Sequence, residues 1–117
     1  MLSRVMLVSA CMLMLPLTAL ADDKAAAAKA AQKADRELNL VYQQLITRLE
    51  NLDPGRKKAL VDAESAWIKF RDLECTFQGS ATGGPAPDRV LYDRCLATLT
   101  TERARELRET LAKTAGD

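Results

Sequence analysis

Residues 38–52 read LNLVYQQLITRLENL, and this stretch decides the fold class. Its large apolar side chains recur at alternating steps of four and three residues: Leu38, Tyr42, Leu45, Leu49 and Leu52. That spacing places them on one stripe of an α-helix, which has to be buried against other elements. Residues 25–34, just upstream, are rich in alanine. We therefore expect the helix to start near Asp23, with an N-terminal extension over residues 22–34 that has little to bury.

Two further helices are predicted downstream. Asp53-Pro54 ends the first helix and starts the second, because aspartate is a good N-cap and proline suits the first helical position. The second helix runs to about Cys75, and Asp88 caps a third that runs to about Lys113. Between them, residues 79–87 (GSATGGPAP) are too rich in glycine and proline for regular structure. The predicted core residues of these two helices are Leu60, Ala63, Trp67, Phe70, Tyr92, Leu96, Leu99, Leu107 and Leu111.

The N-terminal segment has the pattern of a secretory signal peptide. Arg4 supplies a positive charge, residues 5–15 are almost wholly apolar, and Ala19-Leu20-Ala21 is a small-x-small cleavage site. We expect cleavage after Ala21, leaving one helical domain over residues 22–117 in the periplasm or the medium. The apolar run is too short for a transmembrane segment. A lipoprotein cleavage box ending at Cys11 is the alternative, which we disfavour because the apolar run continues past this cysteine.

Cleavage after Ala21 would leave two cysteines, Cys75 and Cys95. An even count in an oxidising compartment indicates one disulfide, and two cysteines allow one pairing. The predicted fold is therefore all-α: a small bundle of three long helices stapled by one disulfide.

The charges and residue types favour a binding protein over an enzyme. The chain has 17 Lys and Arg against 16 Asp and Glu, and loss of Arg4 would make the remainder neutral. A neutral chain has no general attraction to nucleic acid or anionic lipid. The sequence has no histidine, the usual general base and commonest metal ligand, and bonded cysteines supply neither a thiolate nor a zinc site. We predict no catalytic residue, no metal and no cofactor.

Charged residues interrupt the predicted apolar stripes. Charges on a core face need partners, although side chains at the edge of a thin bundle can also extend to water. If the disulfide pins the second and third helices antiparallel, Arg103 lies opposite Trp67, where a cation–π contact is favourable. If the first two helices are antiparallel about residue 53, Asp35 lies opposite Arg71. We predict one structural polar cluster made of Asp35, Trp67, Arg71, Asp72, Glu74 and Arg103.

The spacing W-x3-RD-x2-C at residues 67–75, followed by C-x4-T-x2-R-x3-L at residues 95–107, resembles the motif of the LprI-type lysozyme inhibitor family. This family consists of small exported bacterial proteins, and the resemblance covers about residues 38–111. It implies a helical domain with the two cysteines bridged, and a lysozyme-inhibiting activity. We interpret the matching residues as scaffold and do not assign them to the inhibitory site.

Two functions follow from these predictions. In the first, the chain binds a protein partner, lysozyme, and blocks the cleft of that enzyme with the loop over residues 76–87. The contact residues expected in this loop are Gln78, Ser80 and Thr82. The alternative interpretation is that the loop only connects two helices. The neutral charge gives no electrostatic steering toward basic lysozymes. In the second, the chain is a cell-envelope interaction or assembly module that does not inhibit, and that forms a homo-oligomer through its Ala-rich first helix.

Overall fold

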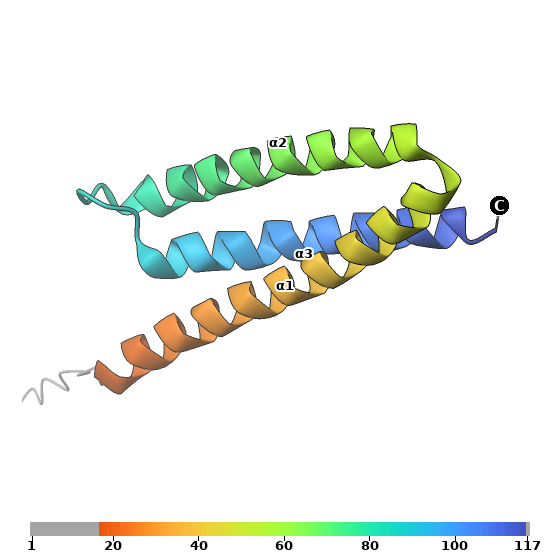
Figure 1. Cartoon of the computed structure of the whole chain (residues 1–117). Helices are drawn as coiled ribbons and strands as arrows, with labels where there is room; N and C mark the ends of the chain where they lie inside the picture. The colour runs from red at the N-terminus through yellow and green to blue at the C-terminus, as the bar shows by residue number, and fades with distance from the viewer. Residues whose placement is uncertain (1–16, 117) are drawn as a thin grey trace, which may run out of the picture.

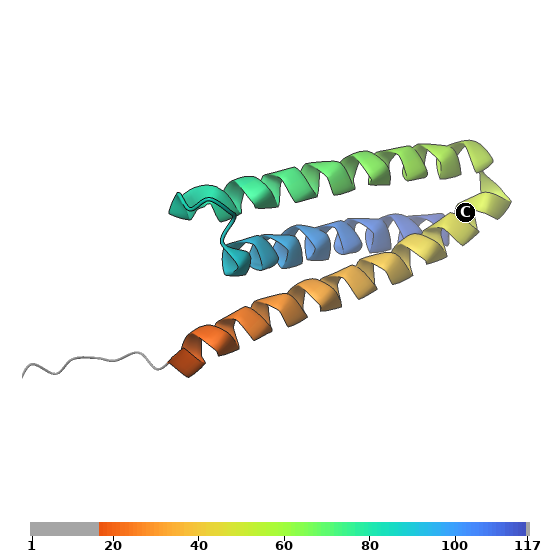
Figure 2. The same ribbon diagram turned by 60° about the vertical axis from the view of Figure 1, so that its left-hand side comes forward.

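The computed structural model describes residues 17–116, which form three α-helices and a short 3₁₀ helix with no strand among them. Helix α1 spans Leu17–Leu52, α2 spans Pro54–Gly79, and α3 spans Arg89–Thr114. The chain runs along α1, returns along α2, and runs along α3 in the first direction again (Figure 1; Figure 2), and each helix packs against the other two. The predicted all-α bundle with one disulfide is confirmed.

The junctions between helices follow the predicted capping chemistry. Asp53 separates α1 from α2, and its side chain accepts a hydrogen bond from the backbone N–H of Arg56 at 3.0 Å. Asp88 does the same for α3, accepting from the backbone N–H of Leu91 at 2.9 Å. Each aspartate satisfies one of the backbone donors that a helix N-terminus leaves free. Both predicted N-caps are confirmed.

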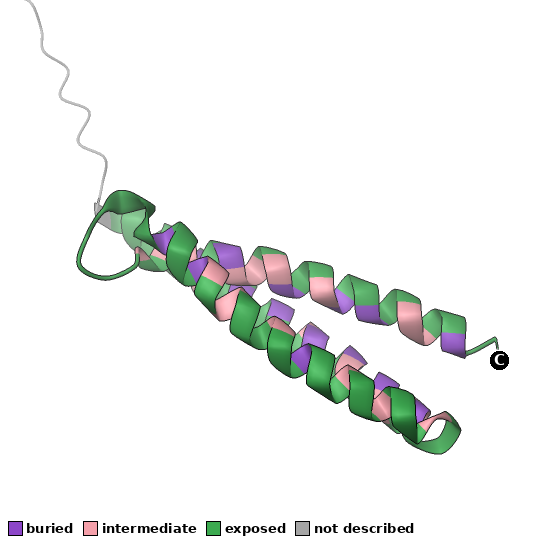
Figure 3. Cartoon of the chain, turned by 90° about the horizontal axis from the view of Figure 1, so that it is seen from above, coloured by how far each residue is buried: buried purple, intermediate pink, exposed green. Residues whose placement is uncertain are grey.

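The apolar core is a seam between α1 and α3. It consists of four buried residues of α1 and two of α3, namely Leu38, Val41, Leu45, Leu49, Ala104 and Leu107. Tyr42, Leu60, Trp67 and Leu111 are partly buried against this seam. Figure 3 shows the result: buried positions lie along the facing sides of the helices, and the outside of the bundle is exposed.

The Ala-rich part of α1 is more buried than predicted. Ala27, Ala31 and Ala34 are buried in the chain, at the same steps of four and three that continue into Leu38. Small side chains at these positions let two helices approach closely, so the buried stripe of α1 continues upstream of Leu38 with alanine in place of leucine. The prediction that residues 22–34 have little to bury was wrong.

Three predicted core residues are exposed. Leu52 is 58% exposed because it lies beyond the end of α3: the Arg48 guanidinium already reaches the backbone carbonyl of Thr114, the last residue of α3, at 3.4 Å. Phe70 is 53% exposed and Ala63 is exposed as well, because α2 turns a different face toward the bundle. The buried residues of α2 are Glu64, Cys75 and Gly79.

Helix α2 is longer and the following loop shorter than predicted. The helix continues past Cys75 to Gly79, and Ser80–Thr82 then form the 3₁₀ helix. The prediction that residues 79–87 have no regular structure was therefore wrong for the first part of the segment. Gly83 follows with φ of 71°, a conformation that glycine adopts without strain.

Candidate functional site

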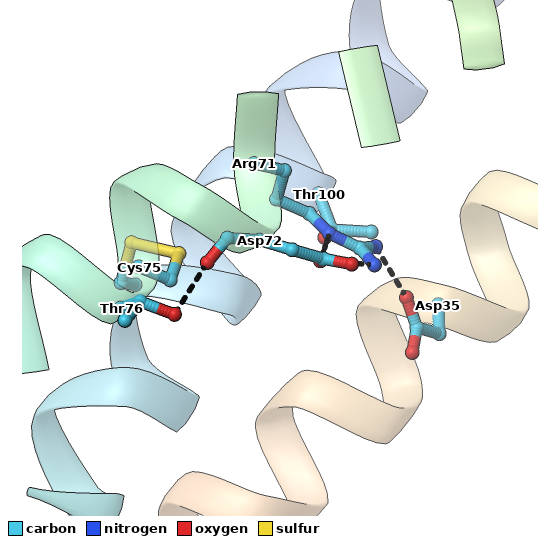
Figure 4. Close-up of polar contacts among 7 residues, drawn as sticks. Asp35, Arg71, Asp72, Cys75, Thr76 and Thr100 are labelled. Atoms are coloured by element: carbon cyan, nitrogen blue, oxygen red, sulfur yellow. Dashed lines mark hydrogen bonds and ion pairs between the residues drawn. A yellow bond between two sulfur atoms is a disulfide. The ribbon is translucent and has the colours of Figure 1, made fainter. Parts of the chain in front are cut away.

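Arg71 on α2 joins all three helices. Its guanidinium donates from Nε to Asp72 Oδ1 at 2.9 Å, and from Nη1 to Asp35 Oδ1 on α1 at 3.2 Å and Thr100 Oγ1 on α3 at 3.4 Å. Figure 4 shows the guanidinium at the centre of these partners. A planar group with five donors can bond several acceptors at once, which a lysine ammonium does less well. Arg71 is thus a three-way link between helices.

Trp67 is stacked by two guanidiniums. The Arg71 Cζ atom lies 5.3 Å from the centroid of the indole ring, and the Arg103 Cζ atom lies 5.9 Å from it. Both distances fall within the range of a cation–π contact. The structure thus brings Trp67 and the two arginines together, across α2 and α3.

The carboxylate that pairs with Arg103 is Glu64. Arg103 Nε donates to Glu64 Oε2 at 2.9 Å, and the two side chains are 17% and 7% exposed. Arg103 also donates from Nη1 to the exposed Glu106 at 3.1 Å. A carboxylate this deeply buried needs its partner, because the lost hydration has to be replaced by an ion pair and hydrogen bonds.

The predicted polar cluster is thus only partly assembled in space. Asp35, Trp67, Arg71, Asp72 and Arg103 come together, whereas Glu74 turns aside and accepts a hydrogen bond from Gln78 at 3.0 Å. Two members were missed, Glu64 and the fully buried Thr100. Glu64 could have been found, since it lies three residues before Trp67 and seven before Arg71, on the same face of α2.

A polar hollow of about 320 Å³ lies between α1 and α2 beside this cluster, lined by Asp35, Leu38, Asn39, Tyr42, Glu64, Ser65, Ile68 and Arg71. Burial raises the pKa of the Tyr42 phenol, and the nearby negative charge of Glu64 raises it further. Tyr42 is thus a neutral hydroxyl at physiological pH. Of the charged groups around the hollow, Asp35 pairs with Arg71 and Glu64 pairs with Arg103, so the cluster has the chemistry of a scaffold.

The loop end of the bundle is closed twice. Cys75 and Cys95 form a disulfide with a Cα–Cα distance of 5.4 Å, and Cys75 is fully buried. One turn further out, the Asp88 backbone N–H donates to the Gly79 carbonyl at 2.8 Å. A Cβ atom on Gly79 would lie 2.8 Å from Pro87 Cβ, so this close approach requires glycine. The loop therefore leaves and re-enters the bundle at one fixed point.

The predicted loop contacts lie at this end. Gln78, Ser80 and Thr82 are all exposed. The Gln78 side chain bonds Glu74, and the Ser80 hydroxyl donates to the Thr76 carbonyl at 2.7 Å. Phe77, beside them, is 73% exposed. The loop end thus carries amide, hydroxyl and aromatic groups that a partner can reach.

Two further properties concern the residues that the structure describes. Within residues 17–116, no cluster of three or more Cys, Asp or Glu side chains could hold a metal ion. Over the same range, no helix is long and apolar enough to cross a membrane.

Comparison with known proteins gives the family. The sequence model described as "Lysozyme inhibitor LprI" matches residues 18–107. An uncharacterized protein of Rhizobium meliloti (strain 1021) is 34% identical over 86 residues, which are 65% of this chain and 62% of that protein. The chain thus spans less than two thirds of the length of this relative. The crystal structure of a DUF1311 family protein from Pseudomonas putida KT2440 is similar with a TM-score of 0.68 and 28% identity, over 77% of this chain and 91% of that one.

Proposed function

The chain belongs to the LprI lysozyme inhibitor family, and we propose that it is an exported protein that binds lysozyme and inhibits it. The observation that carries this proposal is the family match over residues 18–107, which includes the Arg71 cluster and the disulfide. The family is one of inhibitors, so the activity expected is binding without chemistry on a substrate.

Export is supported by the disulfide and by the N-terminal sequence. Disulfides persist in oxidising compartments such as the bacterial periplasm or the medium. Residues 1–16 of the predicted signal peptide, including Cys11 of the lipoprotein alternative, lie outside the described residues. Residues 17–21 are described and form the start of α1. Cleavage after Ala21 remains our proposal for the mature N-terminus.

The loop end is the surface that we assign to lysozyme. A lysozyme cleaves its sugar chain between two carboxyl groups in a cleft, so a group that fills the cleft keeps the substrate out. A loop that is already ordered binds at a lower entropic cost than a flexible one. The hydrogen bond between Asp88 and Gly79 and the disulfide below it give that order. The Thr82 hydroxyl and the second N–H of the Gln78 amide are suitable donors to the cleft carboxylates, whereas the Ser80 hydroxyl already donates to Thr76 and can accept from lysozyme.

A matched pair of threonine variants tests this assignment. Thr82→Glu places a negative charge where we expect the cleft carboxylates, whereas Thr101→Glu makes the same change at an exposed position in the middle of α3. Like charges facing each other at an interface cost several kcal/mol, so Thr82→Glu should weaken inhibition by at least about tenfold. Thr101→Glu should inhibit as the unchanged protein does. The measurement is the rate of cell-wall digestion by lysozyme at increasing inhibitor concentration.

Two results would contradict the proposal at different levels. Equal inhibition by both variants would show that the loop is a connector and that another surface contacts lysozyme. No inhibition of several lysozyme types by the unchanged protein, at concentrations well above that of the enzyme, would remove the function itself. The second candidate function, a non-inhibitory envelope assembly module, would then take its place, and an apolar face of α2 favours that candidate.

A further inference from the structure

Helix α2 exposes an apolar stripe that lies about a third of a turn around the helix from the residues that pair with α1 and α3. At 100° per residue, six exposed residues fall within an arc of roughly 80°. We call them the outer stripe: Ala59, Ala63, Ala66, Phe70, Leu73 and Phe77. The three large members are 53%, 66% and 73% exposed in chain order. Figure 3 looks down on α2, and the side toward the viewer is mostly exposed.

The face of α2 that points inward is polar, whereas a helix in a bundle usually buries an apolar face. It carries Glu64, Trp67, Arg71 and Cys75, which pair with α1 and α3. Amphipathic helices bury an apolar stripe and expose the polar one. On α2, Glu64 and Arg71 are paired inside the chain, and the apolar stripe is exposed. Contiguous apolar surface of this kind marks a protein contact.

The order of large and small residues identifies the partner. The three alanines lie in the N-terminal half of the stripe and the three large residues in the C-terminal half. If a second α2 lies antiparallel with its centre at the level of Ile68, every alanine meets a large side chain: Ala59 with Phe77, Ala63 with Leu73, and Ala66 with Phe70. A twofold interface requires such self-complementarity, because the same patch is used by both copies.

We propose that two copies of the chain associate through their outer stripes, antiparallel about a twofold axis near Ile68. The contact is about 27 Å long at 1.5 Å per residue and about 10 Å wide. It buries at most on the order of 1,000 Å² of accessible surface over the two copies, which is below the standard size of a stable interface and in the range of weak, transient ones. The dimer therefore forms and dissociates with concentration. Its antiparallel arrangement places the two loops at opposite ends, so Gln78, Ser80 and Thr82 stay free to bind lysozyme while Phe77 is used by the dimer.

The Ala-rich part of α1 is less suited to this role. Ala27, Ala31 and Ala34 are already buried within the chain, so the close-packing face of that segment is in use. We therefore place the interface of the homo-oligomer on α2, whereas the sequence-based expectation placed it on the Ala-rich first helix.

An exchange of residues across the proposed register tests the dimer. Leu73→Ala removes a side chain from the interface, and Ala63→Leu overfills the position that receives it. Each single change should raise the dimer dissociation constant at least about tenfold. The double change, Ala63→Leu with Leu73→Ala, recreates the same pair with its members exchanged and should restore dimerisation to within about threefold. The full chain in its disulfide-bonded form is studied by sedimentation equilibrium from about 1 µM to about 500 µM.

Leu40→Ala is the matched control, since Leu40 on α1 is 63% exposed and Leu73 is 66% exposed. It should leave dimerisation unchanged. Helical content, measured by circular dichroism, should be equal in all variants because every altered side chain is exposed. A chain that stays monomeric over the whole range overturns the proposal, as does a dimer that Leu73→Ala leaves intact or Leu40→Ala disrupts. Loss of the dimer in both single variants without recovery in the double variant overturns the antiparallel register.

Discussion

Helices α1 and α2 are held in the bundle by different forces. Helix α1 buries seven apolar side chains along one stripe, from Ala27 to Leu49. Helix α2 buries Glu64, Cys75 and Gly79, and no large aliphatic side chain. It is fixed instead by the disulfide, by the guanidiniums of Arg71 and Arg103, and by the half-buried Trp67.

This difference means that the two helices respond to different conditions. Apolar burial is non-directional, does not depend on redox state and is not weakened by charge screening. A disulfide can be reduced, and ion pairs lose strength as their partners are removed or as solvent enters. We therefore expect α1 and α3 to form a stable pair, with α2 as the part that opens first. Three measurements test this division.

The largest effect should come from the apolar seam. Leu45 is 1% exposed at the centre of the seam, so Leu45→Ala removes buried surface and leaves a cavity, at a cost of about 3–4 kcal/mol. Leu52→Ala is the control on the same helix: that side chain is 58% exposed and its loss should change stability by less than about 0.5 kcal/mol. Denaturant unfolding measures both. Equal losses in the two variants would mean that the seam does not end where α3 ends.

The disulfide should come next. Replacing Cys75 and Cys95 by serine removes a cross-link over a sequence separation of 20 residues and should cost about 3 kcal/mol. The loss should be uneven, because α2 depends on this link more than α1 does. Amide hydrogen exchange should rise along α2 at lower denaturant than along α1 and α3. Exchange that rises equally in all three helices would contradict the division between them.

The smallest of the three effects should come from Arg103. Arg103→Ala leaves the buried Glu64 carboxylate without its partner and should cost about 2–3 kcal/mol. Arg103→Lys should recover only part of this, since an ammonium does not stack on the Trp67 indole as a guanidinium does. The control is Arg105→Ala, in an exposed pair with Glu109, which should change stability by less than about 0.5 kcal/mol. A loss in denaturant unfolding as small as that of the control would show that Glu64 is solvated.

Much of the fold was predictable because it is encoded locally. The helical periods, the two aspartate caps and the single cysteine pair each depend on a few neighbouring residues. The errors concern which face of a helix meets which neighbour. Phe70 belongs to an apolar stripe of α2, but the bundle uses the adjacent stripe of that helix. Periodicity shows that a stripe exists, and the partner that buries it is set by tertiary packing.

In the polar cluster, too, the approximate placement was predictable and the individual side-chain partners were not. A simple antiparallel register placed Asp35 opposite Arg71 and Arg103 opposite Trp67, and the structure has both contacts. The predicted cluster contains three carboxylates, those of Asp35, Asp72 and Glu74, yet the acidic partner of Arg103 is Glu64. Several carboxylates lie within a turn of the cluster, and rotamers decide between them. A predicted register locates a side chain only to within about one helical turn, which does not distinguish between neighbouring carboxylates.

The contact between Gly79 and Asp88 has a consequence for how such proteins diversify. Because a backbone hydrogen bond closes the loop at its base, the residues between these two positions contribute little to holding the helices together. The entropic cost of a longer loop rises only slowly with its length. Insertions, deletions and substitutions at the tip can therefore accumulate while the bundle stays the same. The tip is a natural place to graft a foreign peptide, and the place where one scaffold can acquire new targets.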